Sequence, residues 1–116
     1  MSEGKSNHKF KKNQNVMYLL KANIHLSDES RKQEIKGNNY RPLLSFSNTL
    51  IRSGLIDLEE KLFLEMNKSY DNVLFKIYFY EDLDVENEFF IGREFKILEG
   101  NTFIGSGIIS EIIGVI

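Results

Sequence analysis

The chain has 116 residues, a formal net charge of −2, two histidines and no cysteine. That length corresponds to one domain, and the hydrophobic and charged fractions of 41% and 28% are those of a globular protein rather than of a disordered or collagen-like one. The lack of cysteine excludes a disulfide scaffold, a zinc–thiolate site, an iron–sulfur cluster and a cysteine nucleophile. His8 and His25 are too few for a multi-histidine metal site, and the small net charge provides no global basic field for nucleic acid.

Residues 1–15 are polar and contain four lysines and a single large apolar residue, Phe10. We expect a flexible basic arm here, followed by a single β-barrel domain over residues 16–116. The basic start is not followed by an unbroken apolar run, so no secretory signal is predicted. No segment approaches the roughly 20 apolar residues that span a bilayer. We therefore expect a cytoplasmic protein without membrane association.

From Val16 apolar residues recur at every second position, with Lys21, Asn23 and His25 on the other side, which predicts a strand with His25 exposed. The residues on the apolar side are Tyr18, Leu20, Ala22, Ile24 and Leu26. The charged segment Ser27–Lys36 has no apolar stripe and is predicted to be a loop or one short helical turn. After a turn, Pro42 is expected at the start of a strand over 43–46, because proline is confined to strand starts and edges.

Apolar residues on both sides of Ser53 and Gly54 predict two short strand pieces that meet at a bend or bulge. Residues 61–66 alternate again, and residues 67–72 predict a turn. The run from 73 to 80, VLFKIYFY, is rich in aromatic and β-branched residues, so we expect it to be a central strand.

The last third of the chain is predicted to contain, in order, an acidic loop over 81–88, a strand over 89–98, a hairpin turn at 99–101 and a final strand over 102–113. Gly105 and Gly107 inside that last strand indicate strong coiling or a close backbone approach. Six or seven short strands without a long amphipathic helix predict an all-β sandwich or barrel.

The run from Glu94 to Ile109, EFKILEGNTFIGSGII, resembles without a gap the closing hairpin of the third domain of elongation factor Tu, which typically reads RFAIREGGRTVGAGVV. The matching positions are Phe95, Ile97, Glu99, Gly100, Ile104, Gly105, Gly107 and Ile108. Upstream, KGNNYRP at 36–42 resembles the family's Lys-Gly-Tyr-Arg-Pro turn with two residues inserted. The matches follow the family order over about residues 16–114. The resemblance implies a closed six-stranded antiparallel barrel.

In that family the barrel packs against a GTPase domain and grips the T-stem backbone of aminoacyl-tRNA. This chain lacks a Gly-x-x-x-x-Gly-Lys-[Ser/Thr] loop, so we do not expect it to bind GTP in that manner. RNA gripping uses lysine, arginine and polar groups, but Leu43 and Leu98 replace polar family residues here, and only Gly100 and Arg41 remain of the family's contacts. The acidic residues at 81–88 would repel phosphate.

We therefore expect a non-enzymatic binding module that engages a protein partner and uses no cofactor or metal. Exposed apolar groups favour protein contact over RNA. The expected contact residues are Tyr40, Arg41 and Leu43 on the barrel wall and Leu98, Glu99, Gly100, Asn101 and Thr102 at the hairpin. The partner would be a translation GTPase or an effector that acts on one. The alternative is a translation-accessory RNA-binding domain that contacts tRNA weakly.

Three further hypotheses have less support in the sequence. Asp82, Asp84, Glu86 and Glu88 alternate as in a calcium loop, but the glycine and the final glutamate of such a loop are missing, which favours a solvated acidic loop. Gly105-Ser106-Gly107 is half of a dinucleotide fingerprint without a following helix. The aromatic residues Phe75, Tyr78, Phe79 and Tyr80 are typical of a base-stacking sheet, although barrel packing explains them more simply.

Overall fold

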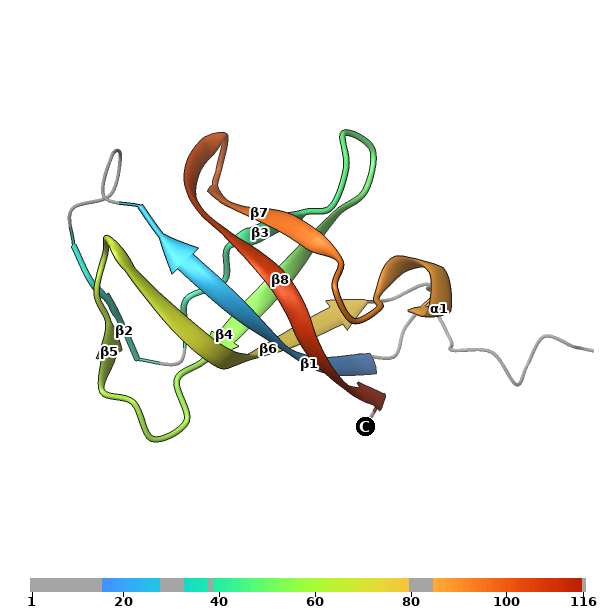
Figure 1. Ribbon diagram of the computed structural model, residues 1–116, viewed down its shortest axis with the longest axis horizontal. Coiled ribbons are helices and arrows are strands. Elements are labelled where there is room, and N and C mark those ends of the chain that lie inside the picture. Colours follow the sequence, from blue (N-terminus) through green and yellow to red (C-terminus); the bar gives the residue numbers. More distant parts are fainter. Residues whose placement is uncertain (1–15, 28–32, 38, 80–84, 116) are drawn as a thin grey trace, which may run out of the picture.

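A computed structural model of the chain describes residues 16–27, 33–37, 39–79 and 85–115. Six antiparallel strands close a barrel in the order β1-β6-β4-β3-β7-β8 (Figure 1). These strands are β1 (Val16–Leu26), β3 (Leu43–Ser45), β4 (Ile51–Asp57), β6 (Lys68–Phe79), β7 (Glu94–Glu99) and β8 (Thr102–Val115). A separate two-stranded ribbon joins β2 (Ile35–Lys36) to β5 (Phe63–Leu64), and a single helical turn, α1 (Val85–Glu88), precedes β7. The predicted closed six-stranded antiparallel barrel is confirmed.

Strand β1 lies between β6 and β8 and shows why the sequence alternates. Leu20, Ala22, Ile24 and Leu26 are all buried, whereas the intervening side chains face outward. Successive side chains of a strand point to opposite faces, so this pattern fixes the register against both neighbours. His25 is exposed, as predicted, and its Nδ1 lies 2.9 Å from the Oγ of Ser69.

A chain of aromatic rings fills the barrel. Ring centroids are 5.0 Å apart between Tyr18 and Phe89, 5.5 Å between Phe89 and Phe46, 5.3 Å between Phe46 and Phe95, and 5.8 Å between Phe95 and Phe75. The Tyr18–Phe89 pair is stacked and the other three are tilted or edge contacts, and such ring contacts add to the gain from burying apolar area. Phe75 is therefore a core residue, as expected from barrel packing, whereas Tyr80 and the side chain of Phe79 lie outside the described structure.

The segment before β7 differs from the prediction. A strand was predicted to begin at Phe89, but β7 begins at Glu94. Phe89 turns inward and is buried against Tyr18, and Gly92 has a φ of 94°, which breaks an extended run. The segment before β7 is apolar because Phe89 covers one end of the core. A strand would show the same apolar residues, so the sequence does not distinguish the two.

Other element predictions were also wrong. The run at 61–66 forms a strand only over Phe63–Leu64, and the predicted loop at 27–36 ends in the strand Ile35–Lys36. Residues 51–57 form one continuous strand, with no bend at Gly54. Gly54 instead makes room for the side chain of Leu44, since a Cβ at Gly54 would lie 2.8 Å from Leu44 Cδ1. The predicted turn at 67–72 belongs to β6 from Lys68 onward. Its turn-like residues reflect a left-handed φ of 62° at Asn67 before the strand and a bulge opposite β1 near Asn72, whose φ is 55°. The barrel is consequently built on three long strands, of 11, 12 and 14 residues, rather than on short ones.

Strand β8 passes very close to β1 and β7 at its two glycines. A Cβ at Gly105 would collide with the carbonyl oxygen of His25, and one at Gly107 would lie 2.5 Å from Phe95 Cζ and 3.0 Å from Ile24 Cγ2. The close approach predicted from these glycines is confirmed.

Gly107→Ala is expected to lower the free energy of unfolding by about 2 kcal/mol, because the added methyl group must displace the packed ring of Phe95. Ser106→Ala, at the exposed position between the two glycines, is the matched control and should change stability by less than about 0.5 kcal/mol. Urea denaturation measures both. Equal midpoints for Gly107→Ala and the wild type would contradict the close packing.

An ion pair holds β4 to β6 on the outer face. Asp57 Oδ2 lies 3.0 Å from Lys76 Nζ, and Asp57 Oδ1 accepts the N–H of Glu59 at 2.8 Å. The hydrogen bond from Glu59 and then the contact with Lys76 lower the pKa of Asp57 below its usual value. A carboxyl whose pKa is lower in the folded state stabilises the fold above its unfolded pKa, and this stabilisation is lost as the pH falls through the folded pKa.

Asp57→Asn should therefore cost about 1 kcal/mol at pH 7, and the difference from the wild type should shrink as the pH falls below about 4. Asp71→Asn, which changes an exposed carboxylate on β6, the strand that carries Lys76, is the control. Chemical denaturation at several pH values measures the effect. A difference between Asp57→Asn and the wild type that stays constant down to pH 2 would contradict this assignment.

Candidate functional site

The structure brings two of the predicted contact residues together. Leu43 on β3 is the Cα partner of Leu98 on β7, and Leu98 is in turn the partner of Phe103 on β8. Residues directly opposite one another in a sheet project from the same face. These three side chains form what we call the apolar row, in which the leucines are half-buried and Phe103 is 40% exposed.

Phe103 was missed by the sequence analysis, although the hairpin itself was predicted. Extending the register outward from the turn pairs Glu99 with Thr102 and Leu98 with Phe103, as observed. The prediction of the turn therefore contained the signal that identifies the third member of the row.

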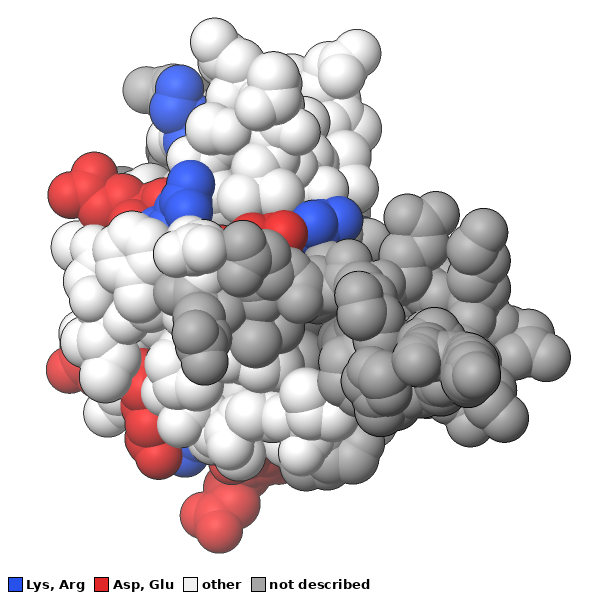
Figure 2. Space-filling model, turned by 90° about the vertical axis from the view of Figure 1, so that its right-hand side faces the viewer, with Lys and Arg blue, Asp and Glu red and all other residues white. Residues whose placement is uncertain are grey.

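The predicted hairpin tip is confirmed as a turn. Gly100 has a φ of 61°, a left-handed conformation that glycine adopts without strain, and Gly100, Asn101 and Thr102 are exposed. The tip and the turn between β3 and β4 project from the same end of the barrel (Figure 1). Figure 2 views the molecule from the side of α1, and its upper part, which contains these two projections, carries few charged side chains.

Tyr40 and Arg41 lie on the other side of β3 from the hairpin. The carbonyl of Tyr40 accepts the N–H of Ile56 at 3.0 Å, so this segment runs beside β4 rather than β7. Arg41 places its guanidinium carbon 5.1 Å from the centre of the Tyr78 ring on β6, a cation–π contact. The predicted contact residues on the barrel wall and those at the hairpin tip therefore lie in two separate places. Of the wall residues, only Leu43 lies beside the hairpin.

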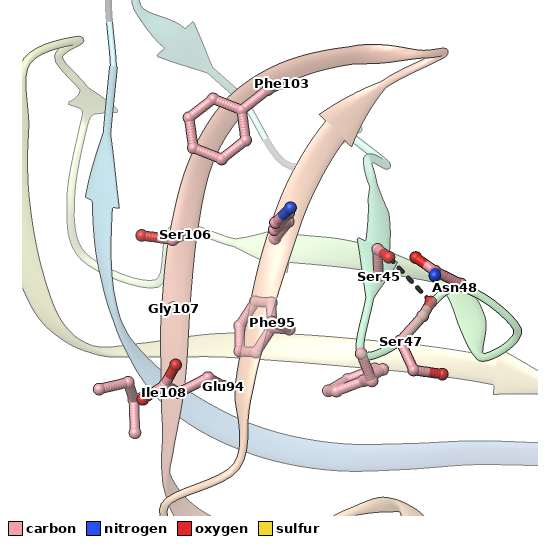
Figure 3. A pocket seen from close by; sticks show the side chains of 11 residues that line it. Ser45, Ser47, Asn48, Glu94, Phe95, Phe103, Ser106, Gly107 and Ile108 are labelled. Atoms are coloured by element: carbon pink, nitrogen blue, oxygen red, sulfur yellow. Dashed lines mark hydrogen bonds between the residues drawn. The ribbon is translucent and has the colours of Figure 1, made fainter.

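A groove with a volume of about 590 Å³ lies beside the apolar row. Figure 3 shows β7 in the middle of the groove, with β8 on one side and the β3–β4 turn on the other. The groove is lined by residues 45–48, 94–96, 103 and 106–108. Hydrogen bonds shape the turn: Ser45 Oγ donates to the carbonyl of Ser47 at 3.2 Å, and Ser47 Oγ accepts the N–H of Leu50 at 3.1 Å.

The end of the predicted acidic loop is held against the barrel. Glu88 accepts hydrogen bonds from Nε and Nη2 of Arg52 at 2.9 to 3.1 Å, and its side chain is only 15% exposed. Arg93 lies between Phe46 and Phe90, with its guanidinium carbon 5.4 Å from each ring centre. Glu88 is therefore paired with an arginine rather than free to repel an anion.

The calcium-loop hypothesis falls largely on residues that the structure does not describe. Asp82 and Asp84 lie outside the described ranges, as does the whole arm at 1–15. Within the described ranges, no group of three or more histidine, aspartate or glutamate side chains could hold a metal ion.

The chain matches no known protein-family model. In the part of the chain that the structure describes, no helix has the length and apolar character needed to cross a membrane.

The exposed member of the apolar row can be tested for a structural role. Phe103→Ser should lower the free energy of unfolding by less than about 1 kcal/mol, because much of the ring already contacts solvent. Ile113→Ser, at a similarly exposed position (45%) on the same strand, is the matched control. Thermal denaturation followed by circular dichroism measures both. A loss of several kcal/mol for Phe103→Ser alone would show that this ring is a packing residue.

Proposed function

We propose that this chain is a non-enzymatic binding module that engages a protein partner through the apolar row and the adjacent hairpin tip. The observation that carries the proposal is the juxtaposition of Leu43, Leu98 and Phe103 on the outside of a closed barrel. Side chains that face outward from a barrel wall contribute little to the core, and apolar residues that gather there mark contact surfaces.

The composition of this surface supports a protein rather than a nucleic acid as partner. The three residues of the row and residues 100–102 at the tip are all uncharged. Binding to RNA depends on cationic groups that neutralise phosphates, and the arginine of the predicted site, Arg41, is stacked on Tyr78 beyond β3. Protein interfaces instead deplete charge at their centre and enrich aromatic residues.

We further propose a GTPase domain of the elongation factor Tu type as the partner. The closed barrel is the architecture that the sequence resemblance implies. Gly105 and Gly107 match the family pattern; Gly105 lies against the backbone of β1, and Gly107 leaves room for the side chains of Phe95 and Ile24. Transfer of the family's packing against a GTPase domain to this chain is an inference by analogy of fold and motif.

Biolayer interferometry of the full chain against purified elongation factor Tu, and against its isolated GTPase domain, tests this proposal. The wild type should bind with micromolar affinity, and Phe103→Ser should weaken binding at least about tenfold, since a central aromatic side chain contributes more than about 1.4 kcal/mol. Ile113→Ser, about 30 Å along the same strand, should bind like the wild type.

Two outcomes would overturn the proposal: no binding of either protein at tens of micromolar, or equal losses in Phe103→Ser and Ile113→Ser. A gel shift of aminoacyl-tRNA at low salt, weakened by Arg41→Ala but not by Phe103→Ser, would favour the RNA-binding alternative.

A further inference from the structure

The groove beside the apolar row contains an open strand edge at one residue, Glu94. Strand β3 ends at Ser45, the Cα partner of Lys96, so Glu94 has β8 on one side and no strand on the other. Backbone groups of an antiparallel strand alternate in direction. The carbonyl of Arg93 accepts the N–H of Ile109 on β8 at 2.9 Å, so the N–H and C=O of Glu94 face the groove. An unpaired edge of this kind is a template for an added extended segment.

The floor of the groove also carries one charge of each sign. Glu94 and Lys96 project from the outer face of β7, about 7 Å apart along the strand, and both are exposed. Neither makes an ion pair with another residue of the described ranges, and their partners on β8, Ile108 and Ser106, are uncharged. A segment with complementary charges would pair with both groups at once.

Apolar surface borders these charges on the β8 side. Phe103 is 40% exposed and Ile108 is 45% exposed, and both line the groove (Figure 3). The groove combines an open strand edge, one charge of each sign and an apolar border. This combination fits an extended peptide better than a flat protein surface, because an extended chain presents alternate side chains to one face.

We infer that the groove takes an extended segment of the protein partner, running antiparallel to β7, that carries an acidic and then a basic residue two positions later. This inference rests on the proposed function and names what the partner presents to the site. Only the residue of the segment beside Glu94 pairs with the edge of β7, in line with β3, which is antiparallel to β7. Because Ser45 occupies the edge beside Lys96, the acidic residue reaches the ammonium group from the outer face. The basic residue then lies beside Glu94, and an apolar neighbour packs on Phe103.

The order of charges provides a sharp test with two blocked peptides of identical composition, acetyl-Val-Glu-Val-Lys-Val-amide and acetyl-Val-Lys-Val-Glu-Val-amide. Each is titrated into the ¹⁵N-labelled full chain, and amide shifts are followed by NMR. The first peptide should bind at least about fivefold more tightly, since two exposed ion pairs are exchanged for two like-charge contacts. The largest shifts should fall on residues 94–96 and 103.

A double charge swap is the decisive variant. Glu94→Lys combined with Lys96→Glu should reverse the preference between the two peptides, whereas Glu111→Lys, an exposed charge change elsewhere on β8, should leave it unchanged. Equal affinities of the two peptides, no shifts at millimolar peptide, an unreversed preference, or shifts centred away from the groove would overturn the inference.

The two proposals fail separately. If elongation factor Tu binds and Phe103→Ser weakens that binding while the peptides show no order preference, the peptide inference is wrong and the proposed function stands. If the protein partner does not bind but the charge order still governs peptide affinity, the groove is a peptide site and the choice of partner is wrong.

Discussion

The barrel depends on how closely β8 can approach its two neighbours. Gly105 lies against the backbone of β1, and Gly107 faces the core between Ile24 and Phe95, so a side chain at either position would push the strands apart. This approach lets a strand of 14 residues coil around the wall and pair with β1 along one part and with β7 along another. The β7–β8 hairpin, and with it the candidate site, takes its position from this coiling.

The short strand β3 and the aromatic residues beside it determine where the groove lies. Strand β3 is only three residues long and ends where the turn after it begins, which leaves the edge of β7 open beyond Lys96. Below this opening, Phe46, Phe89 and Phe95 close the core, and the paired side chains of Arg52 and Glu88 hold the α1 segment in place. A groove can therefore lie at the surface without exposing the interior. The same outer wall carries apolar side chains beside one acidic and one basic group, and this mixture supports the proposed contact with a protein.

Much of the fold could be predicted from the sequence because alternation of apolar and polar residues is visible, as from Leu20 to Leu26, and because Gly105 and Gly107 mark the coiled strand. The prediction of elements was wrong where the same residue type is found in two different structural settings. Phe89 is apolar because it covers the core, and the asparagines at 67 and 72 mark a strand start and a bulge rather than one turn. At the site, Leu43 and Leu98 were predicted separately. The adjacency of Leu43 to Leu98 and the open edge at Glu94 depend on the register between β3 and β7, which are distant in the sequence and whose pairing local patterns do not encode.

We propose that a protein partner contacts the outer face of β3, β7 and β8. Hydrogen–deuterium exchange of the full chain, alone and with elongation factor Tu, is the most direct test, because it maps protection along the whole backbone. We expect slower exchange in the complex for peptides that cover residues 43–50 and 94–108, with little change in the β2–β5 ribbon. Protection confined to that ribbon, or to the Arg41 side of the barrel, would contradict the proposal.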